Sequence, residues 1–172
     1  MPDTAVPEFD LAIIGSGGGA FAAAIRATNL GQRVVMIERG TVGGTCVNTG
    51  CVPSKALLAA ADARHVALDA SGRFPGINVS AGPVDMPGLI AGKDALVEGM
   101  RSEKYVDLIE DYGWDLRQGD ASFTGDAEDP VLEITNADGA VETVRGVGGA
   151  PPLPGGHGLT SVDSVDSRRG GG

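Results

Sequence analysis

The sequence predicts an α/β fold in which a parallel sheet is followed by a small antiparallel β-meander. Two short apolar runs, residues 9–14 and 33–38, flank a glycine-rich turn and a stretch of helix formers. Strand, helix and strand in this order form a crossover unit, which makes the two strands parallel. Short β-branched segments follow between residues 114 and 145. With 172 residues, the chain has material for about one domain.

The crossover unit occupies the first part of the chain. Residues 9–14, Phe-Asp-Leu-Ala-Ile-Ile, are expected to form a strand, and residues 20–29 a helix that Gly31 stops. Residues 33–38, Arg-Val-Val-Met-Ile-Glu, are apolar and β-branched at their centre. This composition is typical of a parallel strand that is buried on both faces.

The middle of the chain is predicted to be a loop followed by two helices. Residues 40–50 contain four glycines and are expected to form the loop. A helix then covers residues 54–68, so that Cys51 lies at or near its start. Residues 72–88 are rich in glycine and proline and predict an irregular segment, whereas residues 89–112 have the spacing of an amphipathic helix.

The last part of the chain predicts the meander and a tail. Four strands are expected to form the meander, at residues 114–117, 121–124, 131–135 and 141–145. From residue 146 onward, glycine and proline are frequent and no apolar period is present, so this part cannot bury enough surface to order itself. We therefore divide the chain into a domain at residues 1–145 and a tail at residues 146–172.

Charge and hydropathy exclude two classes of partner. The formal net charge is −10, which repels phosphate backbones and argues against nucleic acid. No apolar run has the length that crosses a bilayer, so no membrane partner is expected. The first nine residues lack a basic region followed by an apolar stretch, and this predicts a cytoplasmic protein.

A glycine motif marks a candidate dinucleotide site. Residues 15–20, Gly-Ser-Gly-Gly-Gly-Ala, match Gly-x-Gly-x-x-Ala directly after a strand and at the opening of a helix. Gly15 permits a tight turn, Gly17 lets the backbone approach a pyrophosphate, and Ala20 allows close packing of helix on strand. The helix start offers free N–H groups to phosphates. The alternative interpretation is an ordinary glycine-rich turn.

Glu38 supports the dinucleotide interpretation. It ends the second strand, where a carboxylate can accept hydrogen bonds from the hydroxyls of an adenosine ribose. A carboxylate there also repels a 2′-phosphate. The pattern therefore favours FAD or NAD over NADP.

Cys46 and Cys51 are the second chemical feature. A structural zinc site normally needs four ligands, and besides these two cysteines only His65 and His157 are present, at no recognisable ligand spacing. Two ordinary buried thiols are another alternative. We favour a dithiol/disulfide couple, because a spacer with Gly50 can bring the sulfurs into bonding distance and a helix start favours a thiolate.

Residues 43–55, Gly-Gly-Thr-Cys-Val-Asn-Thr-Gly-Cys-Val-Pro-Ser-Lys, are similar to the active-site segment of the pyridine nucleotide-disulfide oxidoreductases. This family includes mercuric reductases, dihydrolipoyl dehydrogenases and glutathione reductases, and the resemblance runs from about residue 9 to 145. Pro-Ser-Lys at residues 53–55 looks less like the glutathione reductases. Residues 96–108, which include Lys104-Tyr105, resemble the mercuric reductases in particular.

The resemblance implies a Rossmann-like FAD-binding domain with a redox-active cysteine pair. Cys51 would be the thiolate against the flavin, Cys46 the outer thiol that meets substrate, and Lys55 the cation that tunes the flavin. Electrons would pass from NADPH through FAD and the cysteine pair to Hg(II), which Cys46 and Cys51 would hold transiently. The implied FAD contacts are Gly15, Ser16, Gly17, Gly18, Gly19, Ala20, Glu38, Arg39, Gly44, Thr45, Cys46, Cys51 and Lys55.

The resemblance also implies that much of the family pattern is missing. Family members continue through a nicotinamide-binding domain and a dimerisation domain, so the chain is expected to be truncated, without an NADPH site and inactive by itself. The tail keeps the family's proline-rich turn but has lost its strand, which suggests a frame error. Dihydrolipoyl dehydrogenase-like chemistry on a small disulfide and a non-enzymatic FAD-domain remnant are the alternative hypotheses.

Overall fold

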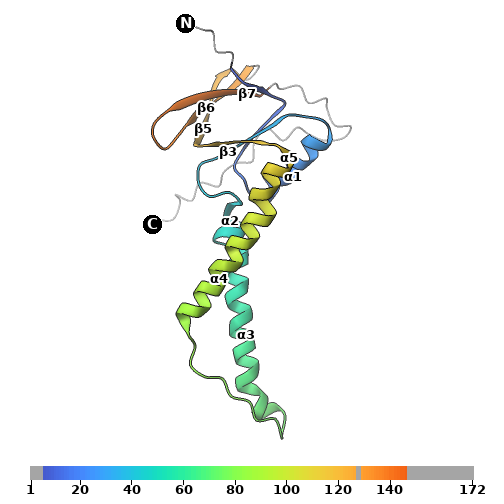
Figure 1. The fold of residues 1–172 in the computed structure, drawn as a ribbon, viewed down its shortest axis with the longest axis vertical. Helices are drawn as coiled ribbons and strands as arrows, with labels where there is room; N and C mark the ends of the chain where they lie inside the picture. The colour runs from blue at the N-terminus through green and yellow to red at the C-terminus, as the bar shows by residue number, and fades with distance from the viewer. Residues whose placement is uncertain (1–5, 127–128, 147–172) are drawn as a thin grey trace, which may run out of the picture.

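The computed structural model describes residues 6–126 and 129–146. Figure 1 shows the strands gathered at one end of the molecule, from which two long helices extend as a hairpin. These helices are α3 (Cys51–Arg73) and α4 (Met86–Arg101). The α/β fold class is confirmed. None of the helices in the described ranges is long and apolar enough to span a membrane.

One of the two sheets is a three-stranded parallel sheet. Its order is β2-β3-β4, and both pairings are parallel. The strands are β2 (Leu11–Ile14), β3 (Val34–Glu38) and β4 (Asp115–Gln118). The helix α1 (Gly18–Asn29) connects β2 to β3, as the sequence predicts.

The second sheet contains the meander and the first strand of the chain. Its order is β1-β7-β6-β5, with β1 parallel to β7 and the other pairs antiparallel. The strands are β1 (Glu8–Phe9), β5 (Asp120–Asp126), β6 (Asp129–Thr135) and β7 (Val141–Gly146). A turn at residues 136–139 joins β6 to β7 and is closed by a hydrogen bond from the Gly139 amide to the Asn136 carbonyl.

One strand prediction was wrong in its extent and another in its pairing. The run at residues 9–14 divides at Asp10, because the amides of Asp10 and Leu11 both donate to the Arg33 carbonyl and interrupt the ladder. The segment expected as the first meander strand, residues 114–117, instead gives β4 beside β3. A helix precedes it, so the chain returns parallel to β3 before it enters the meander at Gly119.

The core lies on both faces of β3. Val34 and Met36 pack with α1 and with Trp114, whereas Val35 and Ile37 pack against the antiparallel sheet. This two-sided burial explains why the strand has no polar residue at its centre. Trp114 is also held by a hydrogen bond from its Nε1 to Thr28 Oγ1, 2.7 Å long.

The helical elements differ from the predictions mainly at their ends. The helix expected at residues 89–112 is continuous from Met86 and consists of α4, a π-helical turn η1 (Ser102–Val106) and α5 (Asp107–Tyr112). It begins early because the Asp85 carboxylate caps it by accepting from the Gly88 amide. The helix α3 runs past residue 68 to Arg73. The tail at residues 147–172 lies outside the described residues.

Candidate functional site

The glycine turn between β2 and α1 leaves room for a ligand. Gly15 has a φ of +95°, which the turn requires and an L side chain rarely adopts. A Cβ added at Gly15, Gly17, Gly18 or Gly19 would meet no atom of the described chain within 4 Å. Within that same part of the chain, α1 has no side-chain cap and no acidic residue in its first turn. The amides there are therefore available to a phosphate.

Ser16 ties this turn to two neighbouring segments. Its side chain is 1% exposed, and its Oγ donates to Glu38 Oε2 at 2.5 Å. The Gly43 amide donates to the same Oγ at 3.1 Å. Glu38 Oε1 accepts from the Gly40 amide at 2.7 Å. The hydroxyl of Ser16 thus points into the protein, where it orients Glu38 and docks the segment that precedes the cysteines.

The segment expected to be a loop contains a short helix, α2 (Gly44–Asn48), so the prediction of a loop throughout residues 40–50 was wrong. Gly43 caps α2 in the left-handed region with φ +106°, and Val47 is buried with 1% exposure. A Cβ at Gly44 would lie 2.8 Å from Gly17 Cα. The two glycine segments are therefore in close contact, which a side chain at Gly44 would disturb.

Cys46 and Cys51 lie close together, on α2 and at the first residue of α3. The position of Cys51 confirms the predicted helix start. Both are exposed, free thiols. Gly50 lets the two helices approach, since a Cβ there would lie 2.9 Å from the Thr45 carbonyl oxygen. The described residues contain no group of three or more histidine, cysteine or acidic side chains that could hold a metal ion.

The electrostatics of Cys46 show that the two sulfurs interact. Its pKa is raised above the ordinary 9.0, first because its thiol is hydrogen-bonded to Cys51, and further by partial desolvation and by the charge of Cys51. Lys55, one turn into α3, opposes this shift with its positive charge. The arrangement brings together the three residues that the sequence suggested for catalysis.

These interactions predict how Cys46 responds to alkylation. The thiolate is the nucleophile, so a raised pKa keeps Cys46 protonated and slows its reaction with iodoacetamide at pH 8. Cys51→Ala removes the hydrogen bond and should speed the reaction at this pH. Lys55→Met removes a positive charge that lowers the pKa of Cys46, so this substitution should slow the alkylation of Cys46. The rates are measured against pH by fragment-ion mass spectrometry, and a wild-type midpoint below 9.0 would contradict the expectation.

Other candidate residues lie at the margin of the site. Arg39 forms an ion pair with Asp120 at 3.8 Å, with both side chains exposed, and is thus partly directed toward the second sheet. Thr45 is exposed on α2 beside Cys46. Asn48 and Arg101 were not singled out from the sequence, although Arg101 Nη1 donates to Asn48 Oδ1 at 3.3 Å. Their 53-residue separation gave no sequence signal.

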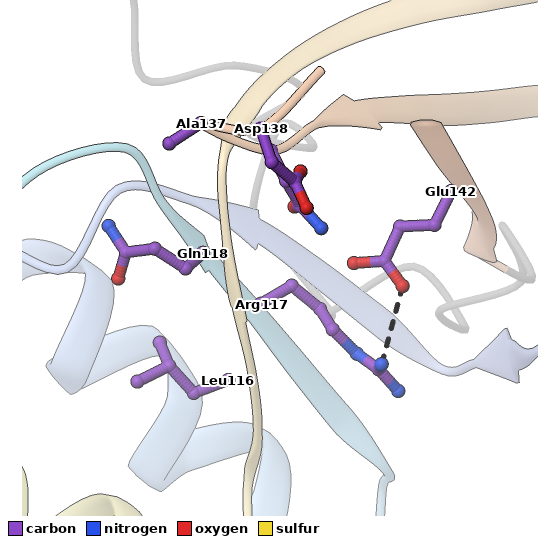
Figure 2. A pocket seen from close by; sticks show the side chains of 7 residues that line it. Leu116, Arg117, Gln118, Ala137, Asp138 and Glu142 are labelled. Carbon is purple, nitrogen blue, oxygen red and sulfur yellow. Dashed lines mark hydrogen bonds and ion pairs between the residues drawn. The ribbon is translucent and has the colours of Figure 1, made fainter. Parts of the chain in front are cut away.

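A separate hollow of about 380 Å³ lies near the end of β4. Figure 2 shows that Arg117 points toward Glu142 in this hollow, where Arg117 Nη1 donates a hydrogen bond of 3.3 Å to Glu142 Oε2. None of the residues that line this hollow belongs to the glycine turn or to the cysteine segment. It is therefore not part of the candidate site. Its lining consists of Leu116, Arg117, Gln118, Asn136, Ala137, Asp138 and Glu142.

Comparison with known proteins agrees with this geometry. Residues 9–167 match the sequence model described as pyridine nucleotide-disulphide oxidoreductase. A mercuric reductase of Streptomyces lividans is 56% identical over 165 residues, which is 92% of this chain and 34% of that protein. A mercuric reductase of Staphylococcus aureus is 47% identical, over 93% of this chain and 28% of that protein.

A more distant relative is dihydrolipoyl dehydrogenase 2, mitochondrial, of Arabidopsis thaliana. It is 39% identical over 133 residues, which is 72% of this chain and 26% of that protein. The chain thus spans about a third or less of the length of these curated relatives.

Proposed function

The chain belongs to the pyridine nucleotide-disulphide oxidoreductase family, and we propose that it is the flavin-binding part of a mercuric reductase. The family consists of FAD-dependent oxidoreductases that use NADPH in their full-length form. The observation that carries the proposal is the placement of Cys46 on α2, which is docked against the glycine turn, and of Cys51 at the start of α3, which packs against α2. Identity of 56% to a mercuric reductase over most of the chain supports this choice within the family.

The residues of the glycine turn fit an FAD pyrophosphate. The space before Gly15, Gly17, Gly18 and Gly19 is open, and the uncapped start of α1 can donate N–H groups to phosphate oxygens. Ala20, half-buried in the first turn of α1, keeps that helix close to the sheet. Bound FAD supplies two-electron redox chemistry.

Glu38 would bind the hydroxyls of the adenosine ribose. Each carboxylate oxygen already accepts one hydrogen bond, from Ser16 and from Gly40, and each can accept another. We propose that Ser16 contributes by holding Glu38 in place and by its backbone. The remaining proposed FAD contacts follow the family pattern and are Arg39, Gly44, Thr45, Cys46, Cys51 and Lys55.

The two cysteines would hold Hg(II) between them. Each thiol loses one proton when its sulfur becomes a ligand, and thiolate sulfur suits a soft metal ion such as Hg(II). Following the family pattern, we propose that Cys46 is the outer sulfur, which an incoming ion meets first. The positive charge of Lys55 partly offsets the interactions that raise the pKa of Cys46. Reduction of Hg(II) to Hg(0) then consumes two electrons, which NADPH provides in the family.

An optical titration of the 172-residue chain with FAD tests this proposal. Bound flavin with the reduced cysteine pair should show long-wavelength charge-transfer absorbance. Cys51→Ser should abolish this band, whereas Cys46→Ser, the matched control, should retain it. Failure to bind FAD, or a band that survives Cys51→Ser, would contradict the assignment.

Substrate class is tested separately on the same reduced chain. We expect one Hg(II) to protect both thiols from alkylation, and lipoamide disulfide to oxidise them poorly. Efficient oxidation by lipoamide with no protection by Hg(II) would favour the dihydrolipoyl dehydrogenase alternative, to which the Arabidopsis relative points. We expect no NADPH consumption by the chain itself, since its sequence holds a single dinucleotide fingerprint.

A further inference from the structure

We propose that Asn48 and Arg101 form a tether that positions the Cys46 thiol against Cys51, an inference that rests on the proposed dithiol role of these cysteines. Asn48 ends α2 and lies between the two cysteines in the chain. Its Nδ2 donates to the carbonyl oxygens of Gly44 at 2.9 Å and Val42 at 3.0 Å. Its Oδ1 accepts from Arg101 Nη1 at 3.3 Å. The Asn48 side chain therefore connects the segment before α2, α2 itself and α4.

The helix α2 needs such a tether because it cannot hold its shape alone. It has five residues, far fewer than the roughly 12 to 15 at which isolated helices become even marginally stable in water. Within the described chain its N-terminus has no side-chain cap, and Val47 is its single buried residue. The position of the exposed Cys46 thus depends on contacts that α2 makes with other segments.

Arg101 is suited to anchor the tether in α4. Its side chain is 24% exposed, so its bond to Asn48 is shielded from solvent more than an ordinary surface contact. The same guanidinium also pairs with Glu98 one turn earlier, where the carboxylate is 65% exposed. Without Arg101, the Asn48 Oδ1 would lose its donor, and the side-chain link from α2 to α4 would be lost, while the bonds from Nδ2 to Val42 and Gly44 would remain.

The tether should act on the oxidation equilibrium of the cysteine pair. When glutathione disulfide oxidises the pair, the Cys46 and Cys51 thiols release two protons and two electrons and form one S–S bond. The glutathione disulfide takes up these two electrons and two protons, its own S–S bond breaks, and two glutathione thiols result. The equilibrium constant rises with the effective concentration of one sulfur at the other. Fixing α2 raises this concentration, so Asn48 and Arg101 favour the disulfide.

The test is a glutathione redox titration of the full chain, read by alkylation and mass spectrometry. Asn48→Ala should lower the equilibrium constant about tenfold, which corresponds to a reduction potential about 30 mV less negative. Arg101→Ala should lower it in the same direction, and Arg101→Lys should restore part of the loss. Adding Arg101→Ala to Asn48→Ala should have no further effect, because both residues act through one contact.

Glu98→Gln is the matched control, since it removes the other partner of Arg101 and should leave the equilibrium constant within about twofold. If Asn48→Ala does not fold by circular dichroism, the two Arg101 variants carry the test. An equilibrium constant that is unchanged in Asn48→Ala, or in Arg101→Ala where that variant alone is measurable, would overturn the tether and leave the dithiol assignment standing. A wild-type chain that forms no Cys46–Cys51 disulfide would overturn both.

Discussion

Replacing Gly44 by alanine weakens FAD binding by about 100-fold, the factor expected when parts of a preorganised site shift by about 1 Å. Gly44 has a φ of +68°, and its new Cβ would lie 2.8 Å from Gly17 Cα and 3.3 Å from the Gly17 amide nitrogen. Both neighbours are backbone atoms, so no rotamer change can relieve the clash. The helix α2 and the glycine turn must therefore move apart. Fluorescence titration with FAD measures the effect.

Gly99→Ala is the control for this substitution. Gly99 lies in α4 at a φ that any residue can adopt, and a Cβ there would meet no atom of the described chain within 4 Å. It should leave FAD affinity unchanged and stabilise the helix by up to about 1 kcal/mol. If Gly44→Ala binds FAD as tightly as Gly99→Ala, the proposed docking of α2 on the glycine turn is wrong.

Truncating Met36 to alanine lowers the free energy of unfolding by about 2–5 kcal/mol, the usual cost of such a change in a packed core. Met36 is 0% exposed at the centre of β3, where it packs with Phe21 of α1 and with Trp114. Urea denaturation should show a lower midpoint with an unchanged slope. Leu58→Ala on α3, where the side chain is 67% exposed, should cost less than about 0.5 kcal/mol. Equal costs would contradict the assigned core.

The parts of the fold that local patterns determine were predicted well. Residues 33–38 read as a strand buried on both faces, and β3 has one core cluster on each side. The glycine turn and the start of α3 at Cys51 were likewise predictable, because strand, turn and helix signals follow one another directly. The pairing of β4 was not, since its residues alternate as any strand does and only the preceding helix settles its direction.

The candidate site shows the same division. The local pattern placed Cys51 at a helix start and Cys46 in the segment before it, and the family resemblance added Lys55, which lies one turn into α3. The inward orientation of the Ser16 hydroxyl depends on Glu38 and on the Gly43 amide, which are distant in sequence. Nothing local distinguishes such a serine from one that faces a ligand.

The helix α3 has the geometry of a long arm whose base carries Cys51. It has 23 residues and thus a length of about 35 Å at ~1.5 Å per residue, and none of its side chains is buried in the described structure. Cys51 is its first residue, so a rotation of the helix about its base carries the far end through a long arc and moves the sulfur little.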